Sequence, residues 1–129
     1  MKKRVIGIGG IFFKTEDREA SREWYAKHLG IESETWGATF PWRRADNPEE
    51  ETYTAWSPFK QENTYFAPSE KPFMINYQVE NLDELLPLLR AEGVHVFEET
   101  QDGDFGKFAW IMDNDGNKIE LWQAPIVIY

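Results

Sequence analysis

The chain has 129 residues, a formal net charge of −9 and no cysteine. This length suits one domain with a single hydrophobic core. The acidic balance argues against a nucleic-acid partner, because phosphate binding needs clustered Lys and Arg side chains. The absence of cysteine excludes disulfides, a thiolate metal site and a Cys nucleophile, which fits the cytoplasm. The apolar stretches are too short and too interrupted for a secretory signal or a membrane span, so we expect a soluble intracellular protein.

The first half of the chain predicts a strand, a helix and then several short strands. Val5–Lys14 is rich in β-branched and aromatic residues and is typical of a strand. Asp17 is a suitable N-cap for a helix that ends at Leu29, with Gly30 as a left-handed terminator. Helical spacing predicts a buried face made of Ala20, Trp24, Tyr25 and Leu29. The strand-like segments that follow are Ile31–Trp36, Thr52–Trp56 and Thr64–Ala67.

The second half of the chain repeats this plan. Phe73–Val79 predicts a strand, and Asn81 with Glu84 resembles a capping box at the start of a helix that ends at Gly93. The apolar stripe of this helix contains Leu82, Leu85, Leu86 and Leu89. The remaining predicted strands are Val94–Phe97, Lys107–Met112 and Lys118–Trp122. An Asp-Gly turn joins the last two strands.

The repeat itself predicts the fold class. The strand-helix-strand pattern begins near Gly10 and again near Met74, a period of roughly 65 residues that is too long for a solenoid repeat. One such unit cannot bury its own apolar face, whereas two packed units can. We therefore expect an α+β fold of two tandem βαβββ modules, at about residues 4–68 and 72–124, within a single domain over residues 1–129.

The C-terminal segment Asp113–Trp122 carries a family resemblance. Its sequence Asp-Asn-Asp-Gly-Asn-Lys-Ile-Glu-Leu-Trp resembles the D-P-D-G-N-x-I-E-L segment that closes a module of the vicinal oxygen chelate superfamily, the glyoxalase/bleomycin-resistance/dioxygenase proteins. Gly10–Asp17, Trp24-Tyr25 and Leu29-Gly30 fit the family frame of the first module. The resemblance covers almost the whole chain and implies a curved mixed sheet around a cleft.

The resemblance also implies an oligomeric state. Members of the superfamily commonly dimerise, so a homodimer is expected. The apolar tail Ile126–Tyr129 would be unusual if it were left in water. It could lie in a dimer interface or fold back on its own chain.

Metal-using members of the superfamily place one ligand on the first strand and one on the last strand of each module. The corresponding positions here are Gly10, Thr54, Met74 and Glu120. Only Glu120 is a strong ligand for a hard cation, and a divalent site normally needs three or four protein groups. His28 and His95 are better explained as solvated or core side chains. We therefore expect no metal and no cofactor.

Strand alternation predicts what surrounds Glu120 in the cleft. The candidate ligand-binding residues are Phe12, Thr54, Trp56, Met74, Asn76 and Trp122. This set suits a small, partly apolar ligand. Glu120 is the candidate catalytic residue, as a general base. The alternative is that Glu120 bonds a neighbouring hydroxyl or amide, such as Thr54 or Asn76, and holds the two halves together.

Three functions follow from this cleft. The first is small-molecule binding without a metal, similar to the drug-sequestering branch of the superfamily. The second is a metal-independent isomerase or lyase that uses Glu120 as its base. The third is a metal-dependent lyase or dioxygenase with ligands elsewhere, which the count of available ligands disfavours. The sequence does not name the ligand.

Overall fold

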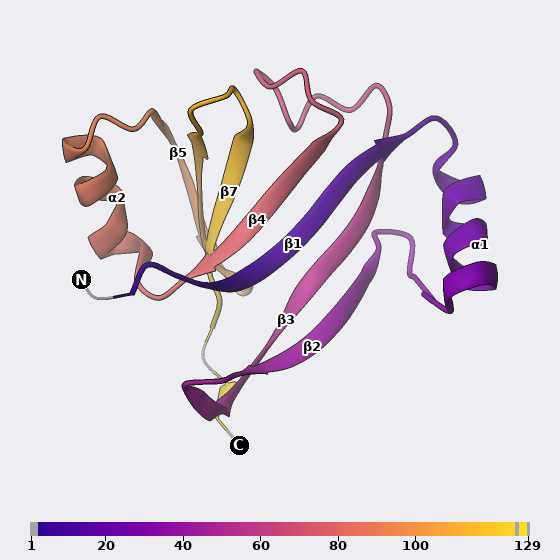
Figure 1. The fold of residues 1–129 in the computed structure, drawn as a ribbon, viewed down its shortest axis with the longest axis horizontal. Helices are drawn as coiled ribbons and strands as arrows, with labels where there is room; N and C mark the ends of the chain where they lie inside the picture. Colours follow the sequence, from indigo (N-terminus) through magenta and orange to yellow (C-terminus); the bar gives the residue numbers. More distant parts are fainter. Residues whose placement is uncertain (1–2, 126, 129) are drawn as a thin grey trace.

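The computed structural model describes residues 3–125 and 127–128. It is an α+β structure in which two helices lie at opposite ends of one mixed sheet (Figure 1). The elements in chain order are β1 (Val5–Thr15), α1 (Arg18–Leu29), β2 (Ala38–Arg44), β3 (Asn47–Lys60), β4 (Phe73–Val79), α2 (Leu82–Ala91), β5 (Val96–Gly103), β6 (Gly106–Met112), β7 (Lys118–Gln123) and β8 (Val127–Ile128).

The strands form one continuous sheet with the order β2-β3-β1-β4-β7-β6-β5, and β8 pairs with β3. At its centre β1 and β4 run antiparallel, and Gly10 lies opposite Asn76. Each of these strands also has a parallel neighbour. β1 pairs with β3, where Gly10 lies opposite Ala55, and β4 pairs with β7, where Asn76 lies opposite Glu120. The two halves therefore meet at Gly10 and Asn76 with matching registers.

The helices differ in how much they bury. Asn81 caps α2, and its side chain accepts a hydrogen bond from the Glu84 amide, as the sequence predicts. The predicted stripe of α2 is buried at Leu82, Leu85 and Leu86, which pack with Val79, Ala109, Ile111 and Leu121. Burying such side chains contributes roughly 1.5–3 kcal/mol each. The second half of the sheet is therefore firmly covered on its outer face.

The predicted buried face of α1 is wrong. The helix has the expected bounds, with Asp17 as its N-cap and Gly30 in the left-handed conformation, yet none of its residues is buried. Trp24 is 53% exposed and Leu29 is 59% exposed. Tyr25 contacts the sheet, where its ring packs against Trp56 of β3. Helical spacing predicts which residues share one face of the helix, but it does not predict whether that face is buried against the sheet.

The first half of the sheet also differs from the predicted strands. Ile31–Trp36 and Thr64–Ala67 are not strands, whereas Ala38–Arg44 forms β2. Among the described residues the first module thus has two strands after its helix, and the second has three. Ser33 explains part of this difference, because its hydroxyl and carbonyl oxygens accept hydrogen bonds from Arg22. These bonds hold the segment against α1.

The C-terminal tail folds back on its own chain over the described residues. Val127 and Ile128 form β8, which pairs antiparallel with Glu51 and Glu50 of β3. Ile126 and Tyr129, which belong to the same predicted apolar tail, lie outside the described residues. Within the described chain, neither helix has the length and apolar character needed to cross a membrane.

Candidate functional site

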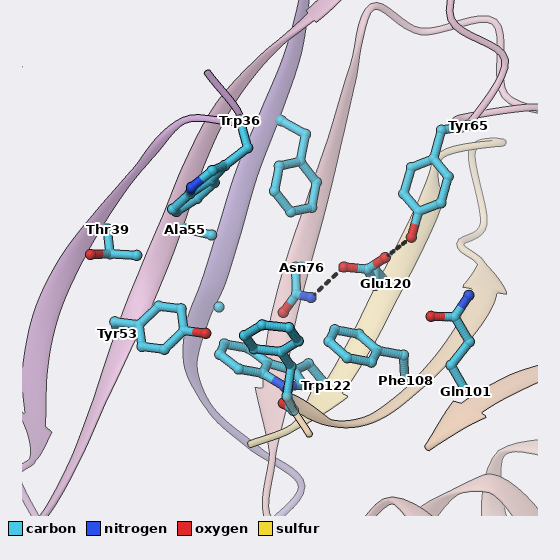
Figure 2. A pocket seen from close by; sticks show the side chains of 13 residues that line it. Trp36, Thr39, Tyr53, Ala55, Tyr65, Asn76, Gln101, Phe108, Glu120 and Trp122 are labelled. Carbon is cyan, nitrogen blue, oxygen red and sulfur yellow. Dashed lines mark hydrogen bonds between the residues drawn. The ribbon is translucent and has the colours of Figure 1, made fainter. Parts of the chain in front are cut away.

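A cavity of about 510 Å³ lies on the face of the sheet opposite the two helices. Such a volume falls within the range of small-molecule sites. Its walls come from both halves of the chain (Figure 2). The lining residues are Gly9, Phe12, Trp36, Thr39, Tyr53, Ala55, Tyr65, Asn76, Gln101, Phe105, Phe108, Glu120 and Trp122.

Glu120 forms the polar centre of this cavity, and its side chain is only 4% exposed. Its Oε1 accepts a hydrogen bond from Asn76 Nδ2 at 2.7 Å. Its Oε2 accepts one from Trp110 Nε1 at 2.9 Å and another from the Tyr65 hydroxyl. A carboxylate offers about four lone-pair sites, so three protein donors use most of them. The network compensates the cost of burying this charge.

The strand registers bring these partners together. Asn76 and Glu120 are paired residues of the parallel strands β4 and β7. Trp110 lies directly opposite Glu120 on the antiparallel neighbour β6. Tyr65 comes from the connection between β3 and β4, so the first half of the chain supplies this donor. One carboxylate therefore ties three strands and a connecting segment together.

Tyr65 remains a proton donor in this arrangement. Burial raises the pKa of its phenol above the ordinary value, and the neighbouring charge of Glu120 raises it further. Both effects disfavour the phenolate, because a negative charge would sit in a partly buried place beside a carboxylate. The neutral hydroxyl therefore donates to Glu120 at any physiological pH.

Aromatic side chains build the walls of the cavity. The Phe108 and Trp122 rings are stacked with centroids 5.9 Å apart and an interplanar angle of 5°. Tyr53 packs against the same indole at 5.1 Å. Trp122 is held in place because its Nε1 donates to the Phe105 carbonyl at 2.6 Å. Tilted and stacked rings of this kind present flat apolar surfaces to a ligand.

Comparisons with known proteins identify the family. A family model described as the Glyoxalase/Bleomycin resistance protein/Dioxygenase superfamily matches residues 7–121. The chain belongs to this superfamily. A search of curated protein sequences found no match.

Solved structures of similar fold agree with the family. Methylmalonyl-CoA epimerase from Mycobacterium tuberculosis is 17% identical with a TM-score of 0.64, and the match covers 97% of this chain and 92% of that one. A variant of the Streptomyces coelicolor methylmalonyl-CoA epimerase, in complex with 2-nitronate-propionyl-CoA, is 18% identical with a TM-score of 0.67, at 93% and 98% coverage. At this identity the likeness shows the fold alone.

The structure places four of the predicted site residues in the cavity wall, namely Phe12, Asn76, Glu120 and Trp122. Of the two bonding partners suggested for Glu120, Asn76 makes the bond and Thr54 does not. The network contains the Asn76 bond of the alternative in which Glu120 holds the two halves together, and its Tyr65 donor comes from the first half of the chain.

The structure places the other three predicted residues outside the cavity lining. The Thr54 hydroxyl bonds the Ile8 carbonyl and accepts from Trp42 Nε1. Trp56 packs against Phe13 and against Tyr25 of α1. The reason is the register of β3, where Ala55 rather than Thr54 pairs with Gly10. Because side chains alternate along a strand, this shift by one residue turns Thr54 and Trp56 to the helix side.

Met74 is the third of these residues and has a different explanation. It lies on the same strand face as Asn76 but is fully buried with Phe66 and Trp110. Its side chain forms part of the core beneath the cavity. Phe12, its pairing partner on β1, packs against this cluster and also reaches the cavity.

The residues in the cleft do not fit a divalent metal ion. In the observed registers the four positions that face each other are Gly10, Ala55, Asn76 and Glu120. Gly10 and Ala55 offer no side-chain donor atom, and the Glu120 oxygens already accept three hydrogen bonds. The described residues contain no group of three or more His, Cys, Asp or Glu side chains placed to hold a metal. A divalent site normally requires such a group.

Sequence reasoning missed several residues of the site. Tyr65 carries no periodic signal, because it lies in a segment that was expected to be a strand and is a turn. Trp110 could have been found, since the Asp-Gly hairpin sets the register that places it opposite Glu120. The further missed wall residues include Trp36, Tyr53, Phe105 and Phe108.

Proposed function

We propose that this protein binds a small, planar and partly apolar molecule in the cleft, without a metal. The observation that carries the proposal is the cavity of about 510 Å³, whose floor holds a bonded carboxylate and whose walls include the stacked pair Phe108 and Trp122. Ligand sites combine apolar walls with a few polar groups in this way. A flat ring could extend the stack of aromatic side chains.

The bonding of Glu120 favours binding over catalysis. A general base must have a lone pair directed at the proton that it removes. Here Asn76, Trp110 and Tyr65 donate to the two carboxylate oxygens. The network therefore supports a role in which Glu120 shapes and rigidifies the floor of the site.

A matched pair of tryptophan substitutions tests the binding proposal. Trp122 and Trp56 are both buried, but only Trp122 lines the cavity. We expect 2-quinolinone, a planar bicyclic probe, to bind the wild type in isothermal titration calorimetry. We expect Trp122→Leu to weaken its affinity by about tenfold or more, because stacking on an aromatic ring is lost. Trp56→Leu should leave the affinity within about twofold. Equal affinity in both folded variants would contradict the proposed site.

A second candidate function is a metal-independent isomerase or lyase with Glu120 as its base. Its support is that Glu120 lines the cavity and that the two proteins of similar fold named above are methylmalonyl-CoA epimerases. Tyr65 is 37% exposed, so its displacement by a substrate would free a lone pair on Glu120 Oε2.

Proton exchange separates the two functions. Wild type and Glu120→Gln are incubated with methylmalonyl-CoA in deuterated water, and the α-proton is followed by NMR. The binding proposal expects no exchange above the rate without protein. If the wild type catalyses exchange and Glu120→Gln does not, the binding proposal is wrong and the isomerase function takes its place, provided that the variant still binds 2-quinolinone.

We also propose that two copies of the chain associate through the outer face of the central strands. Ile8 and Ile11 of β1, with Phe73 of β4, are large apolar side chains exposed on this face. The two helices lie on either side of it and leave it uncovered (Figure 1). Exposed apolar patches of this kind commonly mark interaction sites.

A further inference from the structure

Asn76 lines the cavity and has an unused hydrogen-bond acceptor. The residue is only 2% exposed, and its Oδ1 has no partner. Among the described residues this is the one buried side-chain polar atom without a hydrogen bond. A buried polar group left unpaired is costly, so such an atom calls for a partner from outside the chain.

The orientation of this amide is fixed by its surroundings. The Asn76 nitrogen donates to Glu120 Oε1 at 2.7 Å, and exchanging nitrogen for oxygen would place two acceptors against each other. Gly9 makes room for the oxygen, because a Cβ at that position would overlap Asn76 Oδ1 and come within 2.9 Å of Trp122. The acceptor is therefore held beside the Trp122 ring, in the wall of the cavity.

Tyr53 offers a second polar group without a partner in the same cavity. Its hydroxyl makes no hydrogen bond among the described residues, and burial raises the pKa of this phenol. Its ring packs on Trp122 at 5.1 Å. Figure 2 shows the Tyr53 hydroxyl directed into the cavity, on the side of Asn76. A neutral phenol can donate a hydrogen bond to a ligand carbonyl.

We propose that the cleft selects planar ligands with an N–H donor beside a carbonyl, such as a cyclic amide. The N–H donates to Asn76 Oδ1, the carbonyl accepts from Tyr53, and the ring lies against Trp122. This inference rests on the proposed binding function and names the ligand class for the same site. Sites built to bond a polar group reject analogues that lack it, because their own groups are then left unpaired.

Two matched pairs of probes test the donor. We expect 2-quinolinone to bind the wild type about tenfold or more tightly than 1-methyl-2-quinolinone in calorimetry, since methylation removes the N–H that satisfies Asn76. Indole and 1-methylindole should show the same order. Tyr53→Phe should weaken 2-quinolinone by about fivefold and leave indole unchanged, because indole has no carbonyl for the hydroxyl to bond.

Substitution of the acceptor separates hydrogen bonding from the bulk of the methyl group. In Asn76→Leu the preference for the N–H probes should disappear. Gln78→Leu is the matched control, because Gln78 is a buried amide on the same strand face with both amide atoms paired. Its oxygen accepts from the Thr52 hydroxyl, and its nitrogen donates to the Tyr53 carbonyl. This variant should keep the preference, and circular dichroism checks that both variants are folded.

Each outcome bears on a different claim. Equal binding of the methylated and unmethylated probes to the wild type would overturn the donor inference and leave the proposed function standing. A preference that persists in Asn76→Leu would overturn it as well. If Tyr53→Phe binds 2-quinolinone as well as the wild type does, the carbonyl contact is wrong. If none of the four probes binds the wild type, both the inference and the proposed function are overturned.

Discussion

Glu120 determines the local chemistry of the cleft, because one buried carboxylate satisfies donors from Asn76, Trp110 and Tyr65. The cost of burying a charge is offset when donors surround it, and removing one donor exposes that cost again. The three donors therefore act as a unit, and we expect their individual substitutions to be non-additive. The ionisation of the Tyr65 phenol reports on the charge of Glu120 at the centre of this network.

The phenol of Tyr65 should resist ionisation. Burial and the charge of Glu120 raise its pKa, so the folded state favours the neutral form. Its contribution to stability is therefore complete below the ordinary tyrosine pKa of about 10 and is lost as the pH rises through the higher folded value. The ultraviolet titration curves of folded wild type and folded Tyr65→Phe should therefore coincide below about pH 11, because Tyr65 contributes no phenolate absorbance there.

Glu120→Gln is the companion measurement, because it removes the charge and keeps the shape of the side chain. The phenol of Tyr65 should then ionise at lower pH than in the wild type, and additional phenolate absorbance should develop in the folded variant. An identical titration curve in the wild type and Glu120→Gln would show that the carboxylate does not control Tyr65.

Gly9 is required for the position of the Asn76 amide. A methyl group at Gly9 would overlap Asn76 Oδ1 and crowd Gln78 and Trp122. We expect Gly9→Ala to lower the free energy of unfolding by about 1–3 kcal/mol, the usual cost of overpacking. Gly103→Ala is the control, because no atom lies within 4 Å of the place that its methyl group would occupy and its backbone is not left-handed. Chemical denaturation compares the two, and equal stabilities would contradict the crowding.

The cleft residues differ in how far the sequence predicts them. The motif identifies Glu120, and alternation along β4 and β7 then predicts Asn76 and Trp122 in the same wall. Thr54 was misplaced because a parallel pairing between strands far apart in sequence leaves no local signal of its register. Tyr65 could not be predicted, since its role depends on where a turn reaches across the fold. Local periodicity predicts which side chains share a strand face, but it predicts neither the pairing register of distant strands nor the contacts of a turn.

At the scale of elements, the two helices have equally clear sequence signals but unequal roles. Both begin at a capping side chain that accepts a backbone hydrogen bond, Asp17 in α1 and Asn81 in α2. Only α2 buries residues against the sheet. Most helix stability in proteins comes from such packing rather than from intrinsic propensity. We therefore expect α1 to open more readily than α2.

A pair of leucine substitutions measures this difference. Leu85 of α2 is 2% exposed, whereas Leu29 of α1 is 59% exposed. We expect Leu85→Ala to lower the free energy of unfolding by about 2–5 kcal/mol, because it removes buried methyl groups and leaves a cavity. Leu29→Ala should change it by less than about 0.5 kcal/mol, as is usual for surface positions. Urea denaturation provides the measurement, and a comparable loss in both variants would show that α1 packs more firmly than described.

At the scale of the whole molecule, the sheet has two faces with different chemistry. One face holds the cleft, where Asn76 and Glu120 project from paired strands. The other face carries the helices at its ends and exposed apolar side chains at its centre. The repeat in the sequence predicts that two halves join, and the family resemblance predicts a dimer. The surface that we propose to pair the copies becomes visible only when β1 and β4 are placed side by side.

A lysine substitution at Ile11 tests the proposed dimer. Ile11 is 45% exposed at the centre of this face, so a lysine there can reach water in a monomer without disturbing the fold. Two copies of the charge would meet in an interface between identical faces, and burying them would oppose association. We expect analytical ultracentrifugation to find the wild type as a dimer and Ile11→Lys as a monomer. Leu29→Lys, an exposed site on α1, should remain a dimer. Loss of the dimer in both variants, or a monomeric wild type, would contradict association through this face.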